Sequence, residues 1–243
     1  MSFGTTHTDT LEKAIASTER DIFAAFPDHE PLRAFTSRMI ISALNKRGIH
    51  IPSEEEAFAA LKDHDEVITV PTHIINGFEY EKVLAAAKQC GGTVKISRPL
   101  ISLSADYDAF IRAMAPVFSE KGTQYVLMGH GSEHFADSMY AAMDYRLKAS
   151  GFDNVHIATV EGYPPFELVA ERIKNAKKAV LMPMMLVAGD HAKNDMLLGW
   201  KPKLESLGIK TECIMKGLGE YPEIRKIYAE HAKEAIALND LFF

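Results

Sequence analysis

Two histidines and one glutamate stand directly after predicted strands, where a parallel sheet would place them at one edge. His130 follows the apolar run 124–129, Glu161 follows the run 155–160, and His191 lies in the loop after the run 179–186. Two imidazoles and one carboxylate form a ligand set suited to Co²⁺, Ni²⁺, Fe²⁺ or Zn²⁺. A metal site is therefore one interpretation of these three residues.

Each of these residues also has an ordinary structural interpretation. A histidine in a glycine-rich turn can simply hydrogen-bond locally, His191 or Asp190 can cap the following helix, and Glu161 can be a solvated loop carboxylate. A rival metal pair is His130 with His134, which have the i, i+4 spacing of a zinc-binding helix. That pair is the weaker candidate, because the intervening Gly-Ser-Glu is typical of a turn and a helix start. Spacing alone leaves these alternatives open.

The elements that must position the three residues alternate between short β-branched or apolar runs and longer amphipathic stretches. This alternation predicts an α/β fold with parallel sheets covered by helices on both faces. Helical patterns cover, among others, residues 9–25, 80–88, 132–148 and 222–237. The predicted strands are residues 32–36, 66–71, 93–97, 124–129, 155–160, 179–186 and 209–215.

The two halves of the chain also show a weak internal repeat. Residues 2–5 (SFGT) stand where residues 129–132 (GHGS) stand, each before a long helical pattern. Residues 71–79 align with residues 183–191, so that Glu79 falls opposite His191. Two similar lobes, residues 1–120 and 121–243, would enclose a cleft lined by the carboxyl ends of their strands, where open parallel sheets bind ligands. The repeat leaves almost nothing of a first strand in front of Ser2.

Composition limits the classes of function. A chain of 243 residues with 47% hydrophobic and 25% charged residues is typical of a soluble globular protein, and a net charge of -6 argues against non-specific nucleic-acid binding. The sequence has no apolar run of membrane-spanning length, no signal peptide and no C-x-x-C pair, so we expect a cytoplasmic protein without disulfides. A phosphate-binding loop is absent, which disfavours a nucleotide-binding regulatory domain.

Seven segments of the chain resemble, in the same order, the anaerobic cobalt chelatase family (sirohydrochlorin cobaltochelatase, CbiK type). The resemblance runs nearly end to end, and two of the segments are long and specific. The segments are SFGTTHTDT, RAFTSRMI, PTHIINGFEYEK, MGHGSEH, VEGYP, MLVAGDHAKNDM and GLGE.

This resemblance implies a class II chelatase fold, with two Rossmann-like α/β lobes related by pseudo-twofold symmetry and an active site between them. The family's motif histidines fall on His130 and His191, and its metal-binding carboxylate falls on Glu161. The family inserts Co²⁺ into sirohydrochlorin without ATP in anaerobic cobalamin synthesis, some relatives accept iron, and related enzymes serve siroheme synthesis. The sequence departs from the family in lacking an apolar first strand before SFGT.

Metal insertion requires the loss of two pyrrole N–H protons and delivery of a desolvated cation to the ring. We expect His130 and His191 to bind the ion, with a proton acceptor among them, and Glu161 to complete the site. Glu79 is a candidate for passing protons, or else a helix N-terminal carboxylate favoured by the helix dipole. No nucleotide is expected, and a homo-oligomer is compatible with the sequence. Candidate cations for the substrate carboxylates are Arg33, Arg38, Arg98 and Lys193.

Two alternative functions involve the same histidines. A haem or tetrapyrrole carrier would use them as axial ligands without inserting a metal. A ferrochelatase-type enzyme would insert Fe²⁺ for siroheme. The ligand set leaves this alternative open, because it accepts Fe²⁺, Ni²⁺ or Zn²⁺ as well as Co²⁺.

Overall fold

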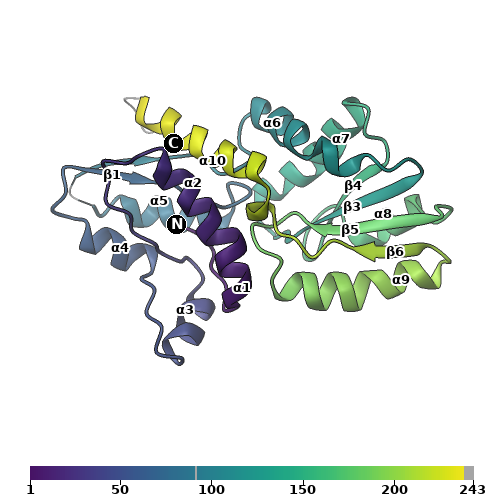
Figure 1. Ribbon diagram of the computed structural model, residues 1–243, viewed down its shortest axis with the longest axis horizontal. Helices are drawn as coiled ribbons and strands as arrows, with labels where there is room; N and C mark the ends of the chain where they lie inside the picture. Colours follow the sequence, from purple (N-terminus) through teal and green to yellow (C-terminus); the bar gives the residue numbers. More distant parts are fainter. Residues whose placement is uncertain (91, 238–243) are drawn as a thin grey trace. The chain divides into compact units, whose positions relative to one another are not determined.

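A computed structural model describes residues 1–90 and 92–237, which form two compact units (Figure 1). The first unit consists of Met1–Ser102 together with helix α10 (Pro222–Ala237), and the second is Leu103–Tyr221. Helix α10 joins the first unit because it packs on α2 and β2, and because Tyr228 donates a hydrogen bond to the backbone of that unit. These boundaries differ from the division at residues 120 and 121 that the sequence repeat predicts.

The second unit is built on a four-stranded parallel sheet with the order β4-β3-β5-β6. Successive residues of a strand point to opposite faces, so Val126 and Met128 pack on one side with Phe166 of α8 and with Trp200. Figure 1 shows α6 and α7 on one side of this sheet and α9 on the other. The strands are β3 (Thr123–Gly129), β4 (Val155–Thr159), β5 (Lys178–Pro183) and β6 (Lys210–Cys213). The helices are α6 (Ser104–Met114), α7 (Ser138–Ala149), α8 (Phe166–Arg172), a π-helical segment (Ala192–Trp200) and α9 (Lys201–Ser206).

The first unit has a smaller sheet, in which β1 and β2 are parallel and α5 connects them. Isolated parallel bridges join Ser2 to Phe35 and Phe35 to Ser53, so the predicted strand 32–36 is reduced to one bridged residue, Phe35. The other six predicted strands are confirmed as β1 to β6. The elements are α1 (Thr8–Thr10), a π-helical segment (Leu11–Ala16), α2 (Ser17–Ala24), α3 (Arg38–Asn45), α4 (Glu54–Ala60), β1 (Glu66–Thr69), α5 (Phe78–Ala87) and β2 (Thr93–Ile96).

The structure supports the internal repeat at its glycines. Gly4 and Gly131, which the repeat aligns, have φ angles of 100° and 78°, a backbone region that residues with a Cβ rarely adopt.

Within the described residues, no helix is long and apolar enough to cross a bilayer.

A charged network ties together the α7, β4 and α8 elements of the second unit. Asp144, on α7, accepts hydrogen bonds from the backbone N–H of Ile157 at 2.9 Å, from Lys148 Nζ at 3.1 Å and from Arg172 Nη1 at 3.2 Å. The Asp144 side chain is 12% exposed, so little water is available to replace these bonds. Lys148 Nζ also lies 3.4 Å from His156 Nδ1.

Two buried histidines make the fold sensitive to acid. Burial lowers the pKa of His73 to about 3, and the positive charge of the Met1 amino group adds to this effect. Burial followed by the charge of Lys148 lowers the pKa of His156 to about 4. An unfolded histidine titrates near pH 6.5. Between about pH 6.5 and pH 4 the unfolded chain therefore binds protons that the folded chain excludes, and stability falls as the pH falls.

We expect each unit to lose about 2 kcal/mol of unfolding free energy between pH 7 and pH 5, at about 1.4 kcal/mol per pH unit below 6.5. Chemical denaturation followed across this pH range measures the slope. His73→Gln should flatten it in the first unit and His156→Gln in the second, whereas His50→Gln, at an exposed position, should leave both slopes unchanged. Equal stability of the wild type at pH 7 and pH 5 would contradict the prediction.

Candidate metal and catalytic site

His130 and Glu161 occupy adjacent loops at the carboxyl edge of the second sheet. His130 follows β3 directly, and its carbonyl oxygen accepts hydrogen bonds from the backbone N–H groups of Val160 and Glu161 at 3.0 and 2.9 Å. These bonds continue the pairing of β3 with β4 beyond the ends of both strands. Strand pairing therefore brings the two side chains together, with His130 Nδ1 at 3.9 Å from Glu161 Oε2.

His191 approaches from the other side of the central strand. It lies after β5, which pairs with β3 in parallel, and it directly precedes the π-helical segment Ala192–Trp200. Its ring centroid lies 4.6 Å from that of His130, with the two ring planes at 88°. The structure therefore brings together all three residues that the sequence places at strand ends.

Hydrogen bonds fix the proton on the same nitrogen of both imidazoles. His130 Nδ1 lies 2.7 Å from the carbonyl oxygen of Gly131, and His191 Nδ1 lies 2.8 Å from Asp195 Oδ2. A carbonyl and a carboxylate can only accept, so each Nδ1 of the neutral histidines carries the proton and each Nε2 carries the lone pair. The two side chains are about two-fifths exposed, at 43% and 39%, so these lone pairs can reach an arriving ligand.

The three residues do not form a closed metal cage. Across residues 1–90 and 92–237, no group of three or more His, Cys, Asp or Glu side chains is arranged to hold a metal ion. Glu161 is 61% exposed and stands beside the Nδ1 side of His130, away from the lone pair on Nε2. The arrangement is thus a pair of imidazoles with a carboxylate close by.

Asp195 is a site residue that we did not single out from the sequence. It follows His191 by four residues, and an i, i+4 spacing on a helix places two side chains on one face. A carboxylate that accepts from the Nδ1–H of a metal-binding histidine orients the ring and raises its basicity. The signal for Asp195 was therefore the H-x-x-x-D spacing itself.

Asp137 is a second such residue, and it ties the two loops of the site together. Its side chain is buried, with Oδ1 accepting from the Ser132 N–H at 2.9 Å and Oδ2 accepting from the Tyr163 N–H at 2.7 Å. A Cβ on Gly162 would lie 2.4 Å from this carboxylate, so the glycine permits the close approach. Asp137 lies far from Tyr163 in the sequence, and no local motif marks it.

Asp137→Ala should lower the activity of the site by about 10–100-fold, the range for losing a group that orients a metal ligand, because the loops that carry His130 and Glu161 lose the carboxylate that joins them. Unfolding free energy should fall by about 1–3 kcal/mol, because two buried N–H groups lose their acceptor. Asp137→Asn keeps one carbonyl oxygen and should recover part of both losses. Steady-state kinetics and chemical denaturation of the two variants test this, and Asp137→Ala with wild-type kinetics would contradict it.

His134 does not pair with His130 on a helix. Residues 135–137 form a 3₁₀ turn, and α7 begins only at Ser138, so the predicted helix 132–148 starts six residues later than expected. The buried His134 ring accepts a hydrogen bond from the Ala136 N–H at 3.1 Å. His134 therefore caps this turn.

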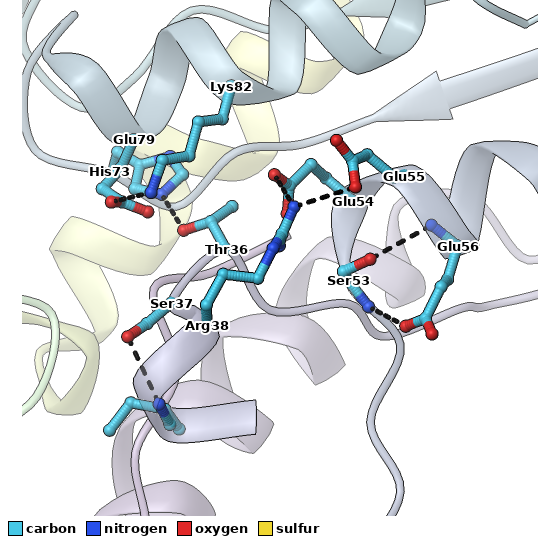
Figure 2. Close-up of polar contacts among 11 residues, drawn as sticks. Thr36, Ser37, Arg38, Ser53, Glu54, Glu55, Glu56, His73, Glu79 and Lys82 are labelled. Atoms are coloured by element: carbon cyan, nitrogen blue, oxygen red, sulfur yellow. Dashed lines mark hydrogen bonds and ion pairs between the residues drawn. The ribbon is translucent and has the colours of Figure 1, made fainter. Parts of the chain in front are cut away.

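Glu79 lies in the first unit, in the first turn of α5, where a carboxylate interacts favourably with the helix dipole. Its carboxylate contacts Lys82 (Figure 2), with Oε1 at 2.5 Å from Lys82 Nζ. Its Oε2 is buried and has no hydrogen-bond partner among the described residues.

The arginines that the sequence offered as substrate-binding cations are engaged within the first unit. Arg33 forms an ion pair with Glu19, and Arg98 with Glu234. Arg38 contacts Glu54 at 2.7 Å and Glu55 at 3.2 Å (Figure 2). In the second unit, Lys193 is exposed and lies two residues after His191.

Comparison with known proteins identifies the relatives of this chain. The family model for cobalt chelatase (CbiK) matches residues 1–237. A sirohydrochlorin cobaltochelatase from Salmonella typhimurium is 36% identical over 250 residues, which cover 97% of this chain and 94% of the relative. The sirohydrochlorin cobaltochelatase CbiKC of Nitratidesulfovibrio vulgaris is 29% identical over 182 residues, covering 69% of this chain and 64% of that protein.

Solved chelatase structures share the fold. SirB from Bacillus subtilis with Fe³⁺ has a TM-score of 0.65 at 13% identity, covering 97% of this chain and 93% of that one. SirB from Bacillus subtilis subspecies spizizenii, in complex with cobalt, has a TM-score of 0.62 at 12% identity, covering 96% and 92%. These likenesses confirm the α/β fold with parallel sheets. The family model and the 36% identical relative together show that this chain belongs to the cobalt chelatase (CbiK) family.

Proposed function

We propose that the protein inserts Co²⁺ into sirohydrochlorin, and that His130 and His191 bind the metal substrate on its way to the ring. The observation that carries the proposal is the pair of imidazoles whose Nδ1 atoms lie within hydrogen-bond distance of the Gly131 carbonyl and of Asp195 Oδ2, so that in the neutral form each Nε2 keeps its lone pair. Neutral imidazole is a good ligand for Co²⁺ near neutral pH. The family match and the printed activity of the Salmonella relative support the same reaction.

An incomplete ligand set suits a metal that must be released. Closed four-ligand sites hold metals structurally, whereas sites that keep an open position exchange ligands. Two imidazoles can bind the ion while water or the macrocycle fills its other positions. Glu161 would offset part of the ion's charge from beside His130, at 3.9 Å.

Proton transfer must accompany the metal. Each insertion replaces two pyrrole N–H protons by one Co²⁺, so two protons leave the ring for each ion that enters. A histidine that releases the ion regains a free lone pair and can accept one of these protons. We assign Glu79 as a further proton acceptor, supported by the unpartnered Oε2 of its carboxylate. Lys193 would contact carboxylates of the macrocycle, since it is exposed and close in sequence to His191.

The ligand set does not by itself determine which metal ion is inserted. Affinity alone does not select Co²⁺, because nitrogen ligands bind Ni²⁺ and Cu²⁺ more strongly in the Irving–Williams order. We expect Fe²⁺, Ni²⁺ or Zn²⁺ to compete in vitro and no nucleotide to be required.

An anaerobic assay with sirohydrochlorin and Co²⁺, followed by the absorbance change of the ring, tests the proposal. We expect the protein to raise the insertion rate well above the rate without protein, with no added ATP. Sirohydrochlorin or haem that binds tightly without any acceleration of insertion would support the carrier alternative. Faster insertion of Fe²⁺ than of Co²⁺ at equal free concentrations would support the iron alternative.

A further inference from the structure

His130 lies in the turn that follows β3, and the carbonyl groups of this turn all have partners. The Gly129 carbonyl accepts from the Val160 N–H at 3.1 Å, and the His130 carbonyl accepts from the Glu161 N–H at 2.9 Å. The Gly131 carbonyl lies 2.7 Å from His130 Nδ1. The course of this turn therefore sets the direction of the imidazole ring.

The N–H groups of the same turn need partners of their own, because an N–H that is buried without an acceptor costs free energy. The Ser132 N–H donates to Asp137 Oδ1 at 2.9 Å. The N–H groups of His130 and Gly131 both donate to one atom, the phenol oxygen of Tyr140. These two N–H groups belong to the peptide groups on either side of the His130 Cα. A single oxygen therefore holds the backbone on both sides of His130.

Helix α7 and a glycine place Tyr140 against this turn. Tyr140 lies in the first turn of α7 and is 3% exposed. A Cβ on Gly129 would lie 2.5 Å from Tyr140 Cε1, so the ring packs directly on the glycine backbone. Burial raises the pKa of Tyr140, and the charge of Asp137 adds to this effect, so the phenol is neutral. A neutral hydroxyl can accept two hydrogen bonds and keep its own proton.

At the equivalent turn of the first unit, an exposed lysine stands in place of the tyrosine. The internal repeat aligns residues 2–5 with residues 129–132, so Phe3 falls opposite His130. Continued without a gap, the same alignment places Lys13 opposite Tyr140, and Lys13 is exposed. The buried phenol therefore accompanies the histidine and is not a requirement of the turn as such.

We propose that Tyr140 is a positioning residue for metal insertion, which holds the backbone of His130 so that His130 and His191 can bind one ion together. This inference rests on the proposed function, in which His130 is a metal ligand. His191 has helical backbone angles, with φ of -60° and ψ of -40°, and Asp195 on the same segment contacts its ring. His130 lies outside any helix, so a side chain from α7 fixes its backbone instead.

Tyr140→Phe tests the proposal, because it removes the oxygen and leaves the ring against Gly129. We expect Co²⁺ to bind at least about 10-fold more weakly, since loss of a group that orients a metal ligand lowers metal affinity by about 10–100-fold. Titration followed by the Co²⁺ absorption bands measures this affinity. The KM for Co²⁺ in the insertion assay should rise by a similar factor. The KM for sirohydrochlorin should change little, because Tyr140 is buried and does not contact the macrocycle.

Hydrogen exchange tests the two hydrogen bonds without any metal. In Tyr140→Phe, the backbone amides of His130 and Gly131 lose their acceptor, and their exchange should be at least about tenfold faster. Gly129→Ala provides a second perturbation, because its Cβ would displace the Tyr140 ring. It should weaken Co²⁺ binding although the phenol is present.

Tyr125→Phe is the matched control. Tyr125 is also buried in the second unit, and its phenol oxygen accepts from the Glu120 N–H at 3.3 Å. It lies near the start of β3, at the other end of the strand from His130. We expect both Tyr→Phe substitutions to lower the melting temperature by a few degrees. Tyr125→Phe should leave Co²⁺ binding and amide exchange at residues 130 and 131 unchanged.

Wild-type Co²⁺ affinity and wild-type exchange in Tyr140→Phe would overturn the proposal. An equal loss of Co²⁺ binding in Tyr125→Phe would also overturn it, because the loss would then follow from reduced stability. A wild type that binds no Co²⁺, with faster exchange at residues 130 and 131 in Tyr140→Phe, would contradict the proposed function while supporting the role of the phenol in holding the turn.

Discussion

His191→Ala and His130→Ala are each expected to lower kcat/KM for cobalt insertion by about 10²-fold or more. Loss of a residue that only orients a metal ligand already has an effect of about 10–100-fold, so loss of the ligand itself should exceed it. The two ring centroids lie 4.6 Å apart, and the two rings are proposed to bind one ion together. Either substitution therefore leaves that ion with a single imidazole ligand. The double variant should therefore be little worse than the single ones, since residues that act as a unit are not additive.

Direct metal titration separates a ligand role from a structural one. The Co²⁺ absorption bands of the wild type should be weakened or lost in both variants, while circular dichroism and the melting temperature stay within the error of the wild type. The two side chains are about two-fifths exposed, so their removal opens no core cavity. His50→Ala provides a matched histidine loss at an exposed position in the first unit. Full activity in both His130→Ala and His191→Ala would show that the site is wrongly assigned.

The three strand-end residues could be predicted as a group because parallel strands end at one edge of a sheet. The prediction needed β4 and β5 to flank β3, and the observed order β4-β3-β5-β6 meets that condition. Strand order depends on pairing between distant segments, which periodicity does not reveal. The family resemblance, and not the residue pattern, indicated that the three residues act as one metal site and that the substrate is a tetrapyrrole.

Other features depended on contacts that leave no periodic signal. The 3₁₀ turn before α7 is stabilised by the His134 side chain, which accepts from the Ala136 N–H, and by Asp137, which accepts from the Ser132 N–H. Because of this turn, α7 begins after the start that the sequence predicts. Helix α10 was predicted correctly as an element, and it packs with the first unit although it lies in the second half of the chain, because an amphipathic pattern does not specify which sheet its apolar face covers. The first sheet is smaller than four strand–helix units predict: within the described residues it has the two strands β1 and β2, and Ser2, Phe35 and Ser53 form only isolated bridges.

Asp144→Ala is the substitution outside the site with the largest expected effect on stability. It should lower the unfolding free energy by about 3 kcal/mol, at the low end of the range for breaking a buried ion pair, since Arg172 is 44% exposed. Much of the loss comes from the groups left behind. The Ile157 N–H is buried without an acceptor, and Lys148 keeps its charge at a site where burial already lowers its pKa.

Two further variants separate the contributions of this carboxylate, with urea unfolding and comparison of Cm at unchanged m as the measurement. Asp144→Asn retains an acceptor for Ile157 and should lose about 1–2 kcal/mol. Arg172→Ala removes only the more exposed partner and should lose about 0.2–1 kcal/mol. A loss under about 0.5 kcal/mol in Asp144→Ala would place this network among surface ion pairs. The expected order, with alanine at 144 worst and alanine at 172 mildest, follows from burial, because the hydrogen bond to β4 is enclosed while the arginine remains in contact with water.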